Sequence, residues 1–147
     1  MYNKIRIYNN LIYKKLSNNN LNMSTVIIII MKTEIVFVQP LKMEVTFHIG
    51  QKQSENFDTI DKGGENDLWF HAKDVSSCHV VCEIPDEIVK KKELMYIIKI
   101  GALLCKNNTS KLKSIQNVEF IYTQIKNITK TAVAGCVTTQ NTKTIVI

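Results

Sequence analysis

The sequence lacks an apolar run long enough to cross a membrane as a helix. The longest run, residues 26–31, has six residues and ends at Lys32, whereas a spanning helix needs about 18 or more. The run has no small-residue cleavage site and lies too far from the start for a standard signal peptide. We therefore expect a cytoplasmic protein with no membrane partner, whose four cysteines are thiols rather than disulfides.

The sequence also lacks the short motifs of common enzyme classes. It contains no phosphate-binding loop, dinucleotide fingerprint, nucleophile elbow or HExxH string. This absence favours a binding module over an enzyme, without a cofactor or a small-molecule substrate.

The string "HAKDVSSCHVVC" (residues 71–82) invites a zinc hypothesis, which the expected geometry weakens. On an extended strand Cys78 and Cys82 lie about 13 Å apart, too far to bind one ion or to form a disulfide. Cys78 and His79 point to opposite faces, so they cannot form a catalytic dyad. His71 and His79 could meet across a hairpin, but a histidine pair without a carboxylate is weak evidence for catalysis. Structural thiols and hydrogen-bonded structural histidines are the simpler alternatives.

The charge is unevenly distributed along the chain. The formal net charge is +6, and residues 1–33 hold five cations and no acid. Residues 34–87 hold four lysines against eleven acids, whereas residues 88–147 hold ten lysines against two acids. An acidic half followed by a basic half indicates an anionic ligand, although lysines that merely solvate a helical face are an equally good explanation.

The first 22 residues contain seven asparagines and no sustained apolar period. We expect them to form a disordered extension, which is untranslated if Met23 or Met31 is the true start. From residue 24 to 147 the sequence predicts a single domain.

Seven segments predict strands, from β-branched runs or alternating polar and apolar residues. They are residues 26–30, 34–39, 44–50, 68–72, 78–83, 118–125 and 142–147. Residues 51–66 are polar and predict a loop with at most one short strand, and residues 73–77 have a length suited to a hairpin between the flanking strands.

One helix is predicted at residues 86–106, with Asp86 and Glu87 in its first turn and Asn107 and Asn108 at its end. Its apolar residues recur at helical spacing: Leu94, Ile97, Ile98, Gly101, Leu104 and Cys105. The order of elements predicts an α+β fold, a largely antiparallel sheet with this amphipathic helix packed on it.

The same helix carries a basic stripe. Lys92, Lys99 and Lys106 recur every seven residues, and with Lys90 and Lys91 the stripe runs about 21 Å, enough to follow several phosphates. A solvated helix face is the alternative.

The string "NDLWFHAKDVSSCHVV" (residues 66–81) resembles the core motif of the NFACT RNA-binding domain, the R domain of ribosome quality-control NFACT proteins and their stand-alone relatives. The segment "IGQKQSENFDTI" (residues 49–60) resembles an upstream element of that family, with Gly50, Glu55 and Asn56 in the expected places. The segments "VEFIYTQIKNITKTAVAGCV" and "KTIVI" resemble its ending, matched by Tyr122, Thr123, Lys126, Lys130, Gly135, Val137 and Thr144. The resemblance covers about residues 43–147.

Three features depart from the family pattern. Ser77 and Cys78 replace a usual Gly-Ser pair, Phe57 stands where an Asp is common, and the loop before the last strand is shortened.

The resemblance implies RNA binding, to tRNA or ribosomal RNA in translation or ribosome-associated quality control, with the large ribosomal subunit as a further partner. An exposed Trp69 would stack on an unpaired base, with His71 and His79 beside it. Lys126 and Lys130 would contact phosphates, with Lys73 and Gln51 as weaker candidates and the stripe of Lys92, Lys99 and Lys106 as a secondary surface. The alternatives are a DNA-binding or protein-docking module and an unrecognised enzyme that uses His71 and His79.

Overall fold

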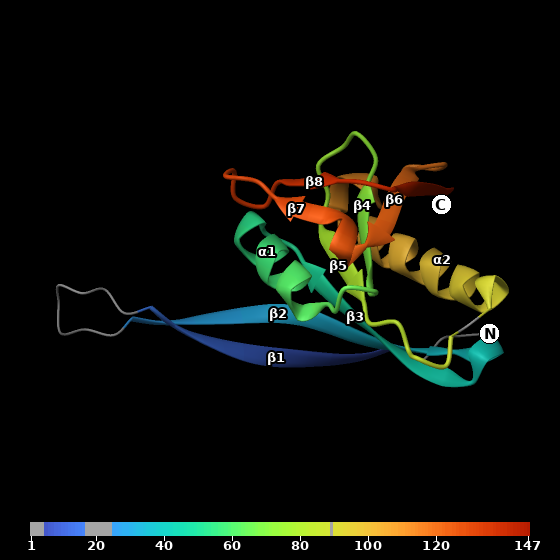
Figure 1. Cartoon of the computed structure of the whole chain (residues 1–147), viewed down its shortest axis with the longest axis horizontal. Helices are drawn as coiled ribbons and strands as arrows, with labels where there is room; N and C mark the ends of the chain where they lie inside the picture. The colour runs from blue at the N-terminus through green and yellow to red at the C-terminus, as the bar shows by residue number, and fades with distance from the viewer. Residues whose placement is uncertain (1–4, 17–24, 89) are drawn as a thin grey trace.

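The computed structural model describes residues 5–16, 25–88 and 90–147 (Figure 1). Within these ranges the chain forms a seven-stranded antiparallel sheet, two α-helices and a separate two-stranded hairpin. The α+β prediction is therefore confirmed. None of the helices in this part of the chain is long and apolar enough to cross a membrane.

The helices are α1 (Gln53–Lys62) and α2 (Lys91–Asn107). The strands are β1 (Ile5–Leu16), β2 (Thr25–Val38), β3 (Met43–Gly50), β4 (Leu68–Ala72), β5 (His79–Cys82), β6 (Glu119–Gln124), β7 (Ile128–Lys130), β8 (Val137–Thr139) and β9 (Lys143–Val146). The strand order in the sheet is β1-β2-β3-β5-β4-β6-β9, and β7 pairs with β8.

The first two strands form a long ribbon that extends away from the helices (Figure 1). Within the expected disordered extension, residues 5–16 form β1 and pair with β2, whereas its remaining residues lie outside the described part of the chain. The two predicted strands at residues 26–30 and 34–39 are one continuous strand, β2. Lys32, in the polar middle of β2, forms an ion pair with Glu34 at 2.7 Å and donates a hydrogen bond to Asn108 Oδ1 at 2.8 Å.

Helix α1 occupies the segment that the sequence predicts as a loop, so that prediction is wrong. It buries only Asn56, Thr59 and Ile60. With two polar residues among three, this stripe is too thin to be recognised as an amphipathic pattern. At the helix start, the Glu55 carboxylate accepts a hydrogen bond from the Gln51 backbone amide at 2.9 Å.

Helix α2 begins at Lys91, five residues later than predicted, because residues 85–88 form a turn closed by the Ile88 amide and the Pro85 carbonyl at 3.0 Å. Asp86 and Glu87 therefore precede the helix, and Glu93 is the acid in its first turn. The predicted apolar stripe faces the sheet, as expected. A Cβ atom at Gly101 would lie 2.5 Å from the Phe70 ring, so glycine allows α2 to approach the sheet closely.

The sheet separates two apolar clusters of different size. On one face α2 packs on a large core that includes Phe47, Phe70 and Phe120, each fully buried. On the other face α1 and the β7–β8 hairpin cover a small cluster built from Ile60, Trp69 and Val81. Because side chains alternate along a strand, neighbours such as Trp69 and Phe70 belong to different faces.

Candidate nucleic-acid interface

A pocket of about 280 Å³ opens on the α1 face of the sheet. Its walls come from the start of α1, from β4, β5 and β6, from the loop after β4 and from the β7–β8 hairpin. Among the side chains that line it are Trp69, His71, His79, Ile121, Val137 and Thr139. The pocket therefore combines an apolar wall with imidazole and hydroxyl groups.

Gly135 closes one side of this pocket. Its φ angle is +74°, and a Cβ atom there would lie 3.0 Å from the Gln53 Cα atom. Both properties require glycine, because other residues rarely adopt this φ and would collide with the α1 backbone. The loop between β7 and β8 thus lies directly against the start of α1.

Trp69 forms the inner wall of the pocket and is only 1% exposed. Its indole Nε1 donates a hydrogen bond to His79 Nδ1 at 3.1 Å, and its ring stacks on His71 with centroids 5.6 Å apart and planes 2° apart. The structure differs here from the expectation of an exposed stacking platform. The sequence shows that Trp69 and His71 share one strand face, but it does not show that α1 and the β7–β8 hairpin bury Trp69 there.

His79 is buried and neutral. Burial, with a smaller contribution from nearby His71, lowers its pKa to about 3. Because Nδ1 accepts the Trp69 hydrogen bond, the proton of the neutral ring is on Nε2. No hydrogen-bond partner is found for Nε2–H among the residues that the structure describes, and His79 lines the pocket.

His71 lies beside His79, with ring centroids 5.1 Å apart, which confirms that the two histidines meet across the hairpin. Its Nδ1 lies 2.7 Å from the Ala72 carbonyl oxygen and donates to it, which leaves Nε2 of the neutral ring as an acceptor. Burial is the main cause that lowers the His71 pKa, and the charge of Lys111 lowers it further. The pair thus offers one donor and one acceptor without a positive charge.

A second hollow of about 270 Å³ adjoins the pocket and shares Gln53, Asn56, Ser76 and Ser77 with it. Its rim carries Lys52 and Lys111, both exposed, and the predicted candidate Gln51. Sequence reasoning missed Lys52 and Lys111, because only the fold brings the start of α1 beside the turn after α2. We call the two hollows together the base groove.

The other predicted lysines are not part of the base groove. Lys73 forms an ion pair with Glu119 at 3.0 Å. Lys130 is held by Asp61 at 2.5 Å, and its Nζ atom lies 5.2 Å from the Phe57 ring centroid. Lys126 donates to the Asn66 side-chain oxygen at 3.1 Å. Phe57, which departs from the family pattern, thus contributes to the contact that holds Lys130.

The stripe on α2 is only partly free. Lys92 and Lys99 are exposed, whereas the Lys106 side chain donates to the Ile147 carbonyl oxygen at 3.2 Å. None of the three lines the base groove.

Three of the four cysteines, Cys78, Cys82 and Cys105, are buried and all four are free. The structure places the Cys78 Sγ atom 3.7 Å from that of Cys105 on α2, a neighbour that the strand spacing could not reveal. Burial raises the pKa of the Cys82 thiol well above its usual value. Over residues 5–16, 25–88 and 90–147, no three His, Cys, Asp or Glu side chains are grouped to hold a metal ion.

A buried His48 is another feature that the sequence did not single out. Its Nδ1 lies 3.2 Å from Thr33 Oγ1 and its Nε2 lies 2.5 Å from Glu83 Oε1. This row has a hydroxyl, an imidazole and a carboxylate, and it joins β2 and β3 to the end of β5.

Comparison with known proteins places this geometry in a family. Residues 35–141 match the family model described as NFACT protein RNA binding domain. The chain is 32% identical over 91 residues to coiled-coil domain-containing protein 25 of Danio rerio, a match that covers 59% of this chain and 42% of that protein. The Dictyostelium discoideum homolog is 28% identical over 98 residues, which cover 67% of this chain and 48% of that protein. The chain thus spans less than half the length of these relatives.

A solved structure shares the fold. It is the C-terminal part of the fibronectin/fibrinogen-binding protein from Streptococcus suis, with a TM-score of 0.59 and 24% identity, covering 70% of this chain and 40% of that one. The family model spans the whole base groove, from Gln51 to Thr139. The chain therefore belongs to the NFACT protein RNA binding domain family.

Proposed function

We propose that the base groove binds an unpaired nucleotide of tRNA or ribosomal RNA, and that the domain acts without catalysis in translation or ribosome-associated quality control in the cytoplasm. The observation that carries this proposal is the buried, neutral His79, which lines the pocket next to a hollow with two exposed lysines and whose Nε2–H has no partner among the described residues.

The chemistry of the pocket fits a nucleobase better than a phosphate. A neutral imidazole donor and a neutral acceptor can hydrogen-bond to the donor and acceptor edge that every base presents once it leaves its stack. A phosphate would instead favour charged groups, which the two histidines do not provide. The apolar wall of Trp69, Ile121 and Val137 fits the faces of a planar base.

Lys52 and Lys111 lie where the backbone of such a nucleotide would emerge. They line the neighbouring hollow, which shares four residues with the pocket. Phosphate contacts hold the strand in register, and base contacts distinguish an unpaired strand from a duplex.

The proposal is tested by fluorescence anisotropy with labelled tRNA, unpaired RNA, duplex RNA and duplex DNA at two salt concentrations. Lys111→Ala should weaken binding to every RNA and reduce the salt slope by about 0.7 for single strands, since one phosphate contact is lost. The matched control is Lys113→Ala, an exposed lysine two residues away that does not line the groove.

His79→Ala should lower the affinity for unpaired RNA but leave the salt slope of binding unchanged, because a base contact releases no counterions. If the wild-type protein, Lys111→Ala and His79→Ala bind all RNAs with equal affinity, the proposal that the base groove binds RNA is refuted. Tighter binding of duplex DNA than of any RNA would instead favour a DNA-binding module.

A further inference from the structure

A separate cleft of about 360 Å³ lies on the α2 side of the sheet, and it shares no residue with the base groove. Leu68, Leu94 and Tyr122 line it with apolar surface, and Lys126 and Lys143 bring two cations to it. The remaining lining side chains are neutral hydroxyl and amide groups, and no acid lines the cleft among the described residues.

Tyr122 offers an aromatic ring that is already held in place. The ring is half-buried and stacks near the fully buried Phe70, with centroids 6.0 Å apart and planes 28° apart. Burial raises the pKa of its hydroxyl, so the phenol is neutral at physiological pH. A preordered ring loses little conformational entropy when a planar group stacks on it.

Among the residues that the structure describes, no acid forms an ion pair with either lysine, unlike Lys73 and Lys130. Lys143 lies directly opposite Tyr122 in the pairing of β6 with β9. The only side-chain hydrogen bond found for Lys126 in the described part of the chain goes to the neutral Asn66 side chain. Both lysines therefore bring uncompensated positive charge to the ring.

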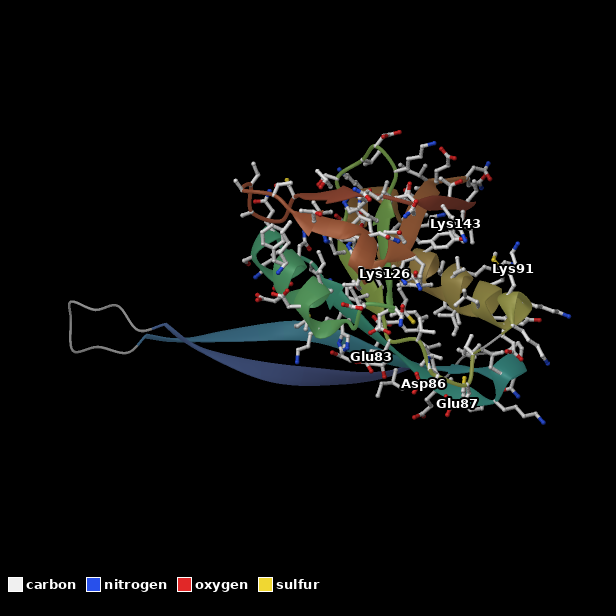
Figure 2. All side chains as sticks on the ribbon, viewed as in Figure 1. Glu83, Asp86, Glu87, Lys91, Lys126 and Lys143 are labelled. Carbon is white, nitrogen blue, oxygen red and sulfur yellow. The ribbon has the colours of Figure 1, made fainter. Side chains whose placement is uncertain are left out.

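Three acids of the chain lie away from this cleft. In Figure 2 the labelled Lys126 and Lys143 lie among the C-terminal strands, and Glu83, Asp86 and Glu87 lie along the lower edge of the same view. Glu83 and Asp86 line a different hollow. An anionic strand is thus attracted to the cleft and repelled by the lower edge.

We propose that this cleft is a second nucleotide subsite, in which a base of single-stranded RNA stacks on Tyr122 and its phosphate lies between Lys126 and Lys143. An aromatic ring flanked by lysines is the combination by which proteins bind unpaired strands. The inference rests on the proposed RNA-binding function, but it assigns a different face of the sheet, so the two can fail separately.

The test is anisotropy with a labelled eight-nucleotide oligouridylate. Tyr122→Leu removes stacking and should weaken binding about fivefold or more, whereas Tyr122→Phe keeps the ring and should bind like wild type. Lys143→Gln should weaken binding and lower the salt slope by about 0.7. The matched control is Lys99→Gln, an exposed lysine of α2 that does not line the cleft.

Lys143 lies exposed on the edge strand, so its replacement leaves the fold intact even if Tyr122→Leu lowers the thermal midpoint. If Tyr122→Leu and Lys143→Gln both bind RNA with wild-type affinity while Lys111→Ala binds more weakly, the second subsite is refuted and the base groove is supported. If Lys143→Gln binds RNA more weakly while Lys111→Ala and His79→Ala keep wild-type affinity, the second subsite is supported and the base groove is refuted.

Discussion

The two faces of the sheet differ in what they leave unfilled. Against α2, the large core is tightly packed and Gly101 lets the helix contact the Phe70 ring, while the cleft beside Tyr122 lies next to this core. Against α1, the cluster of Ile60, Trp69 and Val81 stops short and leaves a pocket with two histidines. The first face supplies stability, and the second combines less apolar packing with groups that can bind a ligand. Trp69 and Phe70, adjacent in sequence, represent the two cases.

The largest expected effect compares these two neighbours. Trp69→Ala and Phe70→Ala should each lower the free energy of unfolding by about 3–5 kcal/mol, because both rings are buried. Urea unfolding measures this. In the folded protein, Trp69→Ala should weaken RNA binding at the base groove, whereas Phe70 does not line that groove. A loss below about 1 kcal/mol for Trp69→Ala would show that its ring is not packed.

The next effect is a pH dependence of stability that arises from His79 on the α1 face. The pKa of His79 is lowered to about 3, so the unfolded state binds its proton first as pH falls below about 6.5. The stability contributed by neutral His79 is thus complete above pH 6.5 and is lost on acidification, by about 2 kcal/mol between pH 7 and pH 5. His71 shifts in the same direction.

Urea melts at the two pH values check this dependence, with His79→Gln as the control that removes it. An equal pH dependence in wild type and His79→Gln would contradict the burial of a neutral imidazole.

A smaller effect sharpens the role of the hairpin that closes the pocket. Gly135→Ala should destabilise the protein by about 1 kcal/mol, because its φ of +74° disfavours a side chain. It should also lower the affinity for RNA, since the added methyl group would contact Gln53 and displace the pocket wall. Thermal melts and anisotropy on this single variant separate the two effects. Unchanged stability and affinity would show that the loop does not need this conformation.

The smallest effect is expected for Lys130. Its contact with Asp61 is exposed to solvent, so Lys130→Ala should change the free energy of unfolding by less than about 1 kcal/mol. RNA affinity should change less than twofold, because Asp61 already neutralises the cation. A loss of affinity equal to that of Lys111→Ala would place Lys130 back in the RNA site.

The sequence predicted the elements whose patterns are local. The alternation in β3 and β4 and the apolar stripe of α2 identify strands and a helix correctly, and the motif around Trp69 and His71 identifies the family. Helix α1 was missed because its buried face is mostly polar, and β1 was missed because its asparagine-rich sequence shows no sustained apolar period, although it pairs with the next strand along the chain.

The candidate site was predictable only in part. His71 and His79 could be placed on one hairpin from their spacing, and the structure brings them together. Lys52 and Lys111 could not be predicted, because the hollow that they line is formed by segments far apart in sequence. The burial of Trp69 and the ion pair of Lys130 likewise depend on α1, which the sequence pattern did not reveal.

The most direct test of the base groove uses Trp69, the single tryptophan of the chain. Its indole N–H gives one resolved signal in a proton–nitrogen correlation spectrum and donates to His79 Nδ1. A short unpaired RNA, added until anisotropy shows saturation, should shift this signal, because a base on His79 Nε2 perturbs the hydrogen bond on the other side of the same ring. Saturated RNA binding with an unshifted Trp69 signal would contradict the account.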